Sequence, residues 1–249
     1  LVGIARLRRA RMSILCLHLP GVPPPWPGGT AAAVILRGGA LGVITTAVIL
    51  STSSFQHASL RALAIPLTYL PLLALAYVQL LRPAGLTFRN GFGLGIKREN
   101  LGRLVCTIFA IVAAGLWGEW VMGRAVEFLN LNNHWTEWFD QDLVWGGPPV
   151  VAVSVLEYVI FAPIFEELAF RGLLFAMLRR RFKFFPAALI STSLFALAHG
   201  YSLIGFLSVF WSGFLWAWIY ERTGSLIPGM IAHAANNLLV CLTVMALLR

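Results

Sequence analysis

The sequence has few charged residues and no cluster of cysteines. Only 12% of its 249 residues are charged, whereas a soluble domain is normally about one-quarter charged. Its three cysteines, Cys16, Cys106 and Cys241, are scattered and form no CxxC pair. This spacing provides no disulfide framework. The low charge excludes an ordinary soluble domain.

Apolar residues dominate instead. They make up 59% of the chain, and the mean hydropathy is +0.79. Several segments approach the ~20 apolar residues that a helix needs to cross a bilayer. We therefore expect an all-α, polytopic transmembrane helical bundle, an integral multi-pass protein surrounded by membrane lipids. We expect seven spans, with eight as the alternative count, near residues 31–53, 58–81, 104–123, 149–178, 184–199, 202–220 and 226–248.

The basic residues indicate how the bundle is oriented. In a membrane protein, a net charge of +9 reflects loop topology rather than nucleic-acid binding, so we expect no nucleic-acid partner. With a cytoplasmic N-terminus, only Arg124 and Arg249 fall outside. The cytoplasmic segments then carry Arg6, Arg8, Arg9, Arg11, Arg82, Arg89, Lys97, Arg98, Arg103, Arg179, Arg180, Arg181, Lys183 and Arg222. This bias predicts an odd number of spans and an external C-terminus.

The first 30 residues differ from the rest. They are rich in arginine and then in proline, and their apolar run, 14–19, is too short for a signal peptide. We expect a flexible cytoplasmic leader over 1–30, followed by transmembrane helices and loops over 31–148.

The segment PIFEELAFRGLLF, residues 163–175, places three charges in an apolar helix. Glu167 and Arg171 are four residues apart and can pair along one helix face. Glu166 is rotated about 100° from Glu167 and has no obvious partner in its own helix. A buried ion-pair network that fixes helix packing is one interpretation. The second carboxylate favours a catalytic role over a packing role, because a desolvated glutamate beside a like charge is suited to act as a general base.

Two histidines in later spans each have a companion on the same helix face. His199 follows Phe195 by four residues in SLFALAHG, and Asn237 follows His233 by four in IAHAANNL. Helices bundled in a membrane bury such polar groups against one another. The three segments together therefore predict one polar site.

These motifs resemble a known family. EELAFR, FALAH and HAANN are similar to the Glu-Glu-x-x-x-Arg, Phe-x-x-x-His and His-x-x-x-Asn motifs of the CPBP superfamily. That superfamily comprises type II CAAX prenyl endopeptidases, bacteriocin-processing enzymes and lysostaphin-resistance-protein-A-like proteins, also called glutamic intramembrane proteases. The resemblance covers about 149–245, which we expect to be the catalytic core.

The resemblance implies catalytic roles for four residues. Glu166 would act as general base and, with His199, activate a water for attack on a peptide carbonyl. His233 and Asn237 would donate hydrogen bonds to the oxyanion, which is worth about 3–4 kcal/mol per preorganised donor. No catalytic position departs from the family pattern.

The resemblance also implies supporting roles. Glu167 and Arg171 would form the ion pair that orients the site, and Phe195 would restrict the rotamers of His199. No cofactor and no metal are expected. The expected partner is a protein or peptide substrate that is membrane-associated or lipidated.

Other mechanisms were weighed against this interpretation. Metal binding by His199, His233 and Glu166 is geometrically conceivable, but HExxH is absent. Serine catalysis has candidates within the spans but no GxSxG context; they are Ser191, Ser193, Ser208 and Ser212. A transport path would use Glu166 as a proton relay, without an evident inverted repeat. The rival function is a catalytically silent immunity factor, scaffold or transporter, with the polar cluster used for packing.

The segment HWTEWFDQDLVWGG, residues 134–147, combines tryptophans with acidic residues. Tryptophans typically anchor a chain at the membrane interface, and the alternative is a lid over the site. High arginine usage and a short helical core indicate a prokaryotic cell membrane. The substrate stays open between prenylated CAAX proteins and other peptides, sorting signals or membrane regulators.

Overall fold

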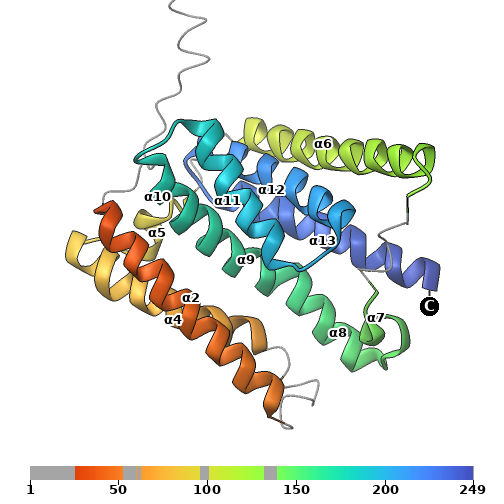
Figure 1. The fold of residues 1–249 in the computed structure, drawn as a ribbon, viewed down its shortest axis with the longest axis horizontal. Helices are drawn as coiled ribbons and strands as arrows, with labels where there is room; N and C mark the ends of the chain where they lie inside the picture. Colours follow the sequence, from red (N-terminus) through yellow and green to blue (C-terminus); the bar gives the residue numbers. More distant parts are fainter. Residues whose placement is uncertain (1–25, 53–59, 61–62, 96–100, 132–138, 249) are drawn as a thin grey trace, which may run out of the picture.

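The computed structural model describes residues 26–52, 60, 63–95, 101–131 and 139–248. Their regular elements are all helical (Figure 1). Most of the expected leader, 1–25, lies outside the described residues. Six of the described helices are long and apolar enough to cross a membrane, which agrees with a polytopic integral membrane protein. They are Gly28–Ser51, Ala64–Ala84, Leu101–Phe128, Pro148–Arg179, Leu203–Thr223 and Ile227–Leu248.

The expected span at 184–199 is shorter than the others. It forms α11, Phe184–Ala198, a helix of 15 residues. Its length is roughly 22 Å, whereas the hydrocarbon core is about 30 Å thick. The helix ends before Gly200, whose φ of 69° is left-handed and stops further helical turns. This helix, the fifth of the seven expected spans, is therefore too short to cross a bilayer as a straight helix.

The fourth span is one long helix with two widened stretches. Its α-helical parts are α8 (Pro148–Leu156), α9 (Ala162–Glu166) and α10 (Ala176–Arg179). Two π-helical stretches join them, η6 (Glu157–Phe161) and η7 (Glu167–Phe175). The helix interior contains Pro163, which has no N–H to donate. π-Helical turns are frequent at functional sites, and here the second stretch begins at Glu167, directly after Glu166.

An N-terminal hairpin packs along one side of this long helix. It consists of α2 (Gly28–Ser51) and α4 (Ala64–Ala76), and α4 continues through a π-helical and a 3₁₀ stretch to Ala84, ahead of the short helix α5 (Phe88–Gly91). The two helices approach closely at Gly38, where a Cβ would lie 2.6 Å from the Leu72 Cα. Small residues allow such close packing between membrane helices.

Three further long helices lie on the other side of the long helix (Figure 1). They are α6 (Leu101–Phe128), α12 (Leu203–Thr223) and α13 (Ile227–Leu248), which contact one another. The Trp211 Nε1–H of α12 donates to the Ala114 carbonyl of α6 at 3.0 Å. The short helix α7 (Gln141–Trp145) packs against α13.

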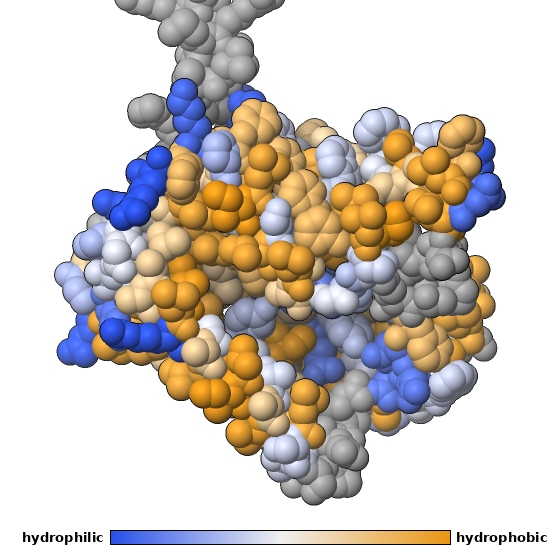
Figure 2. Space-filling view, in the orientation of Figure 1, coloured by the Kyte–Doolittle hydropathy of each residue, from blue (hydrophilic) through white to orange (hydrophobic). Residues whose placement is uncertain are grey.

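The outer surface fits a membrane environment. Figure 2 shows hydrophilic residues gathered towards both ends of the molecule, with a largely apolar band between them. Large apolar side chains that are exposed on the long helices include Leu36, Phe109 and Trp120. A hollow that contains hydrophilic atoms interrupts the band on the face in view.

We predict that Gly118→Ala destabilises the bundle. A Cβ at Gly118 would lie 2.1 Å from the Trp211 Nε1, and overpacking a filled interface costs about 1–3 kcal/mol. The melting temperature in detergent should fall. Gly123→Ala is the matched control in the same helix, because its Cβ would meet nothing within 4 Å. Equal melting temperatures for the two variants would contradict the packing described here.

Candidate active site

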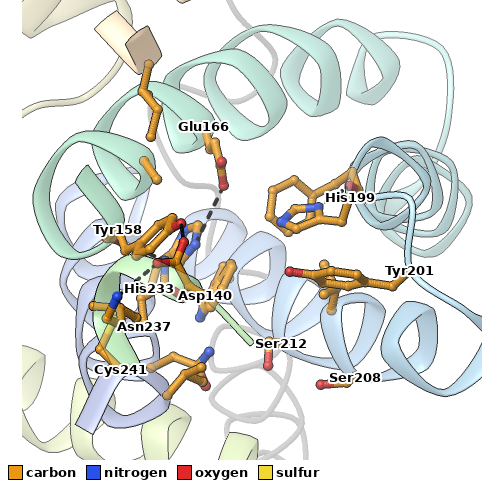
Figure 3. A pocket seen from close by; sticks show the side chains of 18 of the residues that line it. Asp140, Tyr158, Glu166, His199, Tyr201, Ser208, Ser212, His233, Asn237 and Cys241 are labelled. Carbon is orange, nitrogen blue, oxygen red and sulfur yellow. Dashed lines mark hydrogen bonds and ion pairs between the residues drawn. The ribbon is translucent and has the colours of Figure 1, made fainter. Parts of the chain in front are cut away.

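A cavity of about 290 Å³ lies between the long helix, α7, α12 and α13. Figure 3 shows its polar side chains pointing towards a common space. Four of the residues expected to be catalytic line it, together with Phe195. The complete lining is Ile65, Phe139, Asp140, Leu143, Tyr158, Ala162, Glu166, Phe195, His199, Tyr201, Ser208, Val209, Ser212, Trp216, His233, Asn236, Asn237, Val240 and Cys241.

An ion pair lies behind the cavity wall. The Arg171 Nη1 lies 2.9 Å from the Glu167 Oε1, and the two side chains are 1% and 0% exposed. The Arg171 Nη2 donates to the Gly213 carbonyl at 2.9 Å. Only a glycine fits there, because a Cβ at position 213 would lie 2.7 Å from that nitrogen. The guanidinium also lies over the Phe195 ring, 4.3 Å from its centroid. The pair is thus held from both sides.

His233 lies between the two glutamates. Its Nδ1 is 3.3 Å from the Glu167 Oε1, and its Nε2 is 3.7 Å from the Glu166 Oε2. The imidazole stacks on Trp216 with ring centroids 3.8 Å apart. Glu166 has no obvious partner in its own helix, and the structure supplies one from α13. Because each ring nitrogen faces a carboxylate, the three groups have to share at least two protons to avoid repulsion between acceptors.

His199 lies at the end of α11 on the opposite side of the cavity from Glu166 (Figure 3). Its Nδ1 is 2.9 Å from the Phe195 carbonyl. A carbonyl can only accept, so Nδ1 carries the proton and the neutral ring keeps a lone pair on Nε2. Phe195 also packs edge-on against the imidazole, with centroids 4.7 Å apart. This contact and the hydrogen bond fix the orientation of the His199 ring.

Asn237 is positioned by a backbone carbonyl of the long helix. Its Nδ2 donates to the Tyr158 carbonyl at 2.8 Å. In the π-helical stretch η6, the Ala162 N–H donates to the Glu157 carbonyl. The next donor in that register would be residue 163, which is a proline without an N–H. Pro163 thus opens the site at which the Asn237 amide binds, and Asn237 keeps its second amide hydrogen and its Oδ1 for other partners.

The segment before α7 forms part of the cavity wall. Asp140 accepts from the N–H groups of Asp142 and Leu143 at 2.8 and 3.0 Å, which caps α7. Its other oxygen accepts from the Tyr158 hydroxyl at 2.6 Å. The Trp135, Trp138 and Glu137 side chains lie outside the described residues. Within the described part, Phe139, Asp140 and Leu143 line the cavity, and Asp140 is tied to the helix that carries Glu166.

Sequence reasoning missed several lining residues. Tyr158 and Tyr201 belong to none of the recognised motifs, and Asp140 was considered only as an acidic residue of the segment 134–147. A signal did exist on α12, where Ser208, Ser212 and Trp216 recur at four-residue spacing on one face. That face lines the cavity.

The two rival chemistries have different geometries. Among the described residues, no group of three His, Cys, Asp or Glu side chains is arranged to hold a metal ion. Two of the serine candidates, Ser208 and Ser212, line the cavity. The Ser208 hydroxyl donates to the Glu119 Oε1, and Ser191 donates to the Ala188 carbonyl at 3.2 Å. Neither of these contacts is with a histidine that could activate the hydroxyl.

We predict that Arg171→Met destabilises the protein strongly. It leaves the Glu167 carboxylate buried without its cation, a change that costs about 3–5 kcal/mol. The melting temperature in detergent should drop well below that of Arg124→Met. Arg124 is the matched control because its ion pair with Glu127 is 67% and 66% exposed, and such pairs contribute ~1 kcal/mol or less. A similar small change in both variants would show that the Glu167–Arg171 pair does not hold the site.

Comparisons with known proteins agree with the motifs. Residues 148–239 match the family model described as Type II CAAX prenyl endopeptidase Rce1-like. The protein named "Putative membrane peptidase YdiL" from Bacillus subtilis (strain 168) is 32% identical over 157 residues, which cover 62% of this chain and 60% of that relative. The chain therefore aligns with about three-fifths of the length of this curated relative. No solved structure matches. The matched segment contains Glu166, His199 and His233, and it confirms the resemblance of residues 148–239 to the Rce1-like type II CAAX prenyl endopeptidases.

Proposed function

We propose that this protein is an intramembrane endopeptidase of the glutamic type. It hydrolyses a peptide bond of a membrane-associated or lipidated protein or peptide. The observation that carries the proposal is the meeting of Glu166, His199, His233 and Asn237 in one cavity within the bundle. The family match and the peptidase relative support the reaction class.

The two glutamates have different surroundings. The Glu166 side chain is 17% exposed and lines the cavity, whereas Glu167 is 0% exposed and is held by Arg171. A water in the cavity can therefore reach the Glu166 carboxylate. The His199 Nε2 supplies a second acceptor on the facing wall. Two acceptors on either side of one water orient its lone pair towards a carbonyl carbon and can remove its proton.

The reaction then proceeds without a covalent enzyme intermediate. The water oxygen bonds to the carbonyl carbon as Glu166 takes a proton from the water, and the C–N bond breaks as that proton passes to the amine. The carbonyl oxygen becomes negative in the transition state. Two N–H groups are suited to donate to this oxygen: the second amide hydrogen of Asn237 and the Nε2–H of His233. The His233 Nε2 lies 3.7 Å from the Glu166 Oε2, which is too long for a short hydrogen bond, so its N–H can turn to the substrate oxygen.

The catalytically silent alternative receives less support. A packing role requires ion pairs and hydrogen bonds within the protein, such as those that the Arg171 guanidinium makes with the Glu167 Oε1 and the Gly213 carbonyl. Glu166 and His199 instead line an open cavity. The relative is named as a peptidase, which also favours an enzyme.

We predict that Glu166→Gln and His199→Gln each abolish most proteolysis. Loss of a general base typically lowers the rate by about 10²–10⁴-fold. The measurement is cleavage of a pool of quenched fluorescent peptides with apolar centres by the purified protein in detergent. Glu127→Gln is the control, because its side chain is 66% exposed on α6 and it should keep full activity.

Folding must be matched in this comparison. Each variant should elute as a single species and melt within a few degrees of the parent protein. Parent-like cleavage by a folded Glu166→Gln or His199→Gln protein would contradict the proposed mechanism. Cleavage by neither the parent nor Glu127→Gln would contradict the proposed function itself.

We further predict that chelators leave the rate unchanged. The proposed water is activated by side chains alone, so EDTA or 1,10-phenanthroline should not alter cleavage by the purified protein. Inhibition by a chelator that zinc reverses would favour the metal alternative with His199, His233 and Glu166 as ligands.

A further inference from the structure

The lining of the cavity reaches one end of the bundle, here called the cavity mouth, and none of its residues comes from the other end. Its lining includes Ile65 at the start of α4, Phe139 and Asp140 before α7, and His199 and Tyr201 between α11 and α12. All five lie where helices begin or end on the same side of the membrane. The deepest lining residues belong to helix interiors, and Glu166 lies roughly 20 Å along its helix from Arg179.

The opposite end of the bundle is basic. At the end with the cavity mouth, the basic residue among the described ones is Arg124, which pairs with Glu127 at 2.7 Å. The basic residues described at the other end are Arg82, Arg89, Arg103, Arg179, Arg180, Arg181, Lys183 and Arg222. Lysine and arginine accumulate in the cytoplasmic loops of membrane proteins. The cavity mouth therefore lies on the extracytoplasmic side.

The basic end is also closed by side-chain contacts. Arg179 binds Glu221 through two nitrogens at 2.9 and 2.8 Å and donates to the Phe182 carbonyl at 2.7 Å. Arg180 donates to the Trp26 carbonyl. These bonds tie the end of the long helix to α12 and to the start of α2. No lining residue of the described cavity comes from this end.

We propose that the site acts on peptide bonds presented at the extracytoplasmic face of the membrane, in proteins that are anchored there. This inference rests on the proposed function and narrows its substrate class. It argues against prenylated CAAX tails, because those tails commonly carry polybasic segments that bind the anionic cytoplasmic leaflet.

Labelling of single cysteines tests the orientation. In a protein whose Cys16, Cys106 and Cys241 are replaced, Gln141→Cys marks the cavity end and Lys183→Cys marks the basic end; both native side chains are exposed. A membrane-impermeant maleimide applied to intact cells should label Gln141→Cys at once and Lys183→Cys only after permeabilisation. The reverse pattern would overturn the inference.

Vesicles of known orientation test the side on which cleavage occurs. The probe is a membrane-impermeant quenched peptide with charged ends and an apolar centre, chosen for cleavage by the protein in detergent. Right-side-out vesicles should cleave it at least ten times faster than inside-out vesicles, and detergent should make the two rates equal. Faster cleavage by inside-out vesicles would overturn the inference while leaving the proposed function intact. Absence of cleavage in detergent would instead contradict the proposed function, and the labelling pattern would still decide the orientation.

Discussion

The buried Glu167–Arg171 ion pair is the interaction on which the rest of the site depends. Two charges that are almost completely excluded from solvent have to be paired and hydrogen-bonded. This requirement brings α12 close to the long helix, because the Arg171 guanidinium needs the Gly213 carbonyl. It also brings in α13, because His233 contacts the same carboxylate oxygen as Arg171. Three helices therefore have their mutual positions fixed by one pair of charges.

The backbone of the long helix contributes as much as its side chains. In the register of its π-helical stretch the residue opposite the Tyr158 carbonyl is Pro163, which cannot donate, and this carbonyl accepts from the Asn237 amide. The Tyr158 hydroxyl in turn binds Asp140, which caps α7. Pro163 thus links Asn237, the candidate oxyanion donor, to Asp140 in the segment that lines the cavity before α7. Glu166 lies on the same helix, about one turn after Pro163.

Much of the site could be predicted from residue types and spacing. Four-residue spacings indicate shared helix faces, and buried polar groups in membrane helices have to meet, so Glu166, His199 and His233 could be placed together. The contact between His233 and both glutamates could not be predicted, because it depends on the rotation of α13 about its axis. The hydrogen bond between Asn237 and the Tyr158 carbonyl could not be predicted either. It involves a backbone group whose surroundings depend on the π-helical register, which the pattern of side chains does not reveal.

The fold was predictable to a similar degree. Apolar runs located the spans, since every long run has to be helical in lipid. The expected span at 184–199 agrees with α11, Phe184–Ala198, to within one residue, and the left-handed backbone at Gly200 follows its end. Phe139 and Asp140 reach the cavity through tertiary packing of α7 on α13, which a tryptophan-rich pattern does not specify.

The central claim is that Glu166 and His199 act on one water. A double-mutant cycle on kcat/KM tests this most directly, with Glu166→Gln, His199→Gln and the double variant compared with the parent protein. Residues that act as a unit are strongly non-additive, so the double variant should be about as slow as the slower single variant. Losses that simply multiply would show independent roles and would contradict the account.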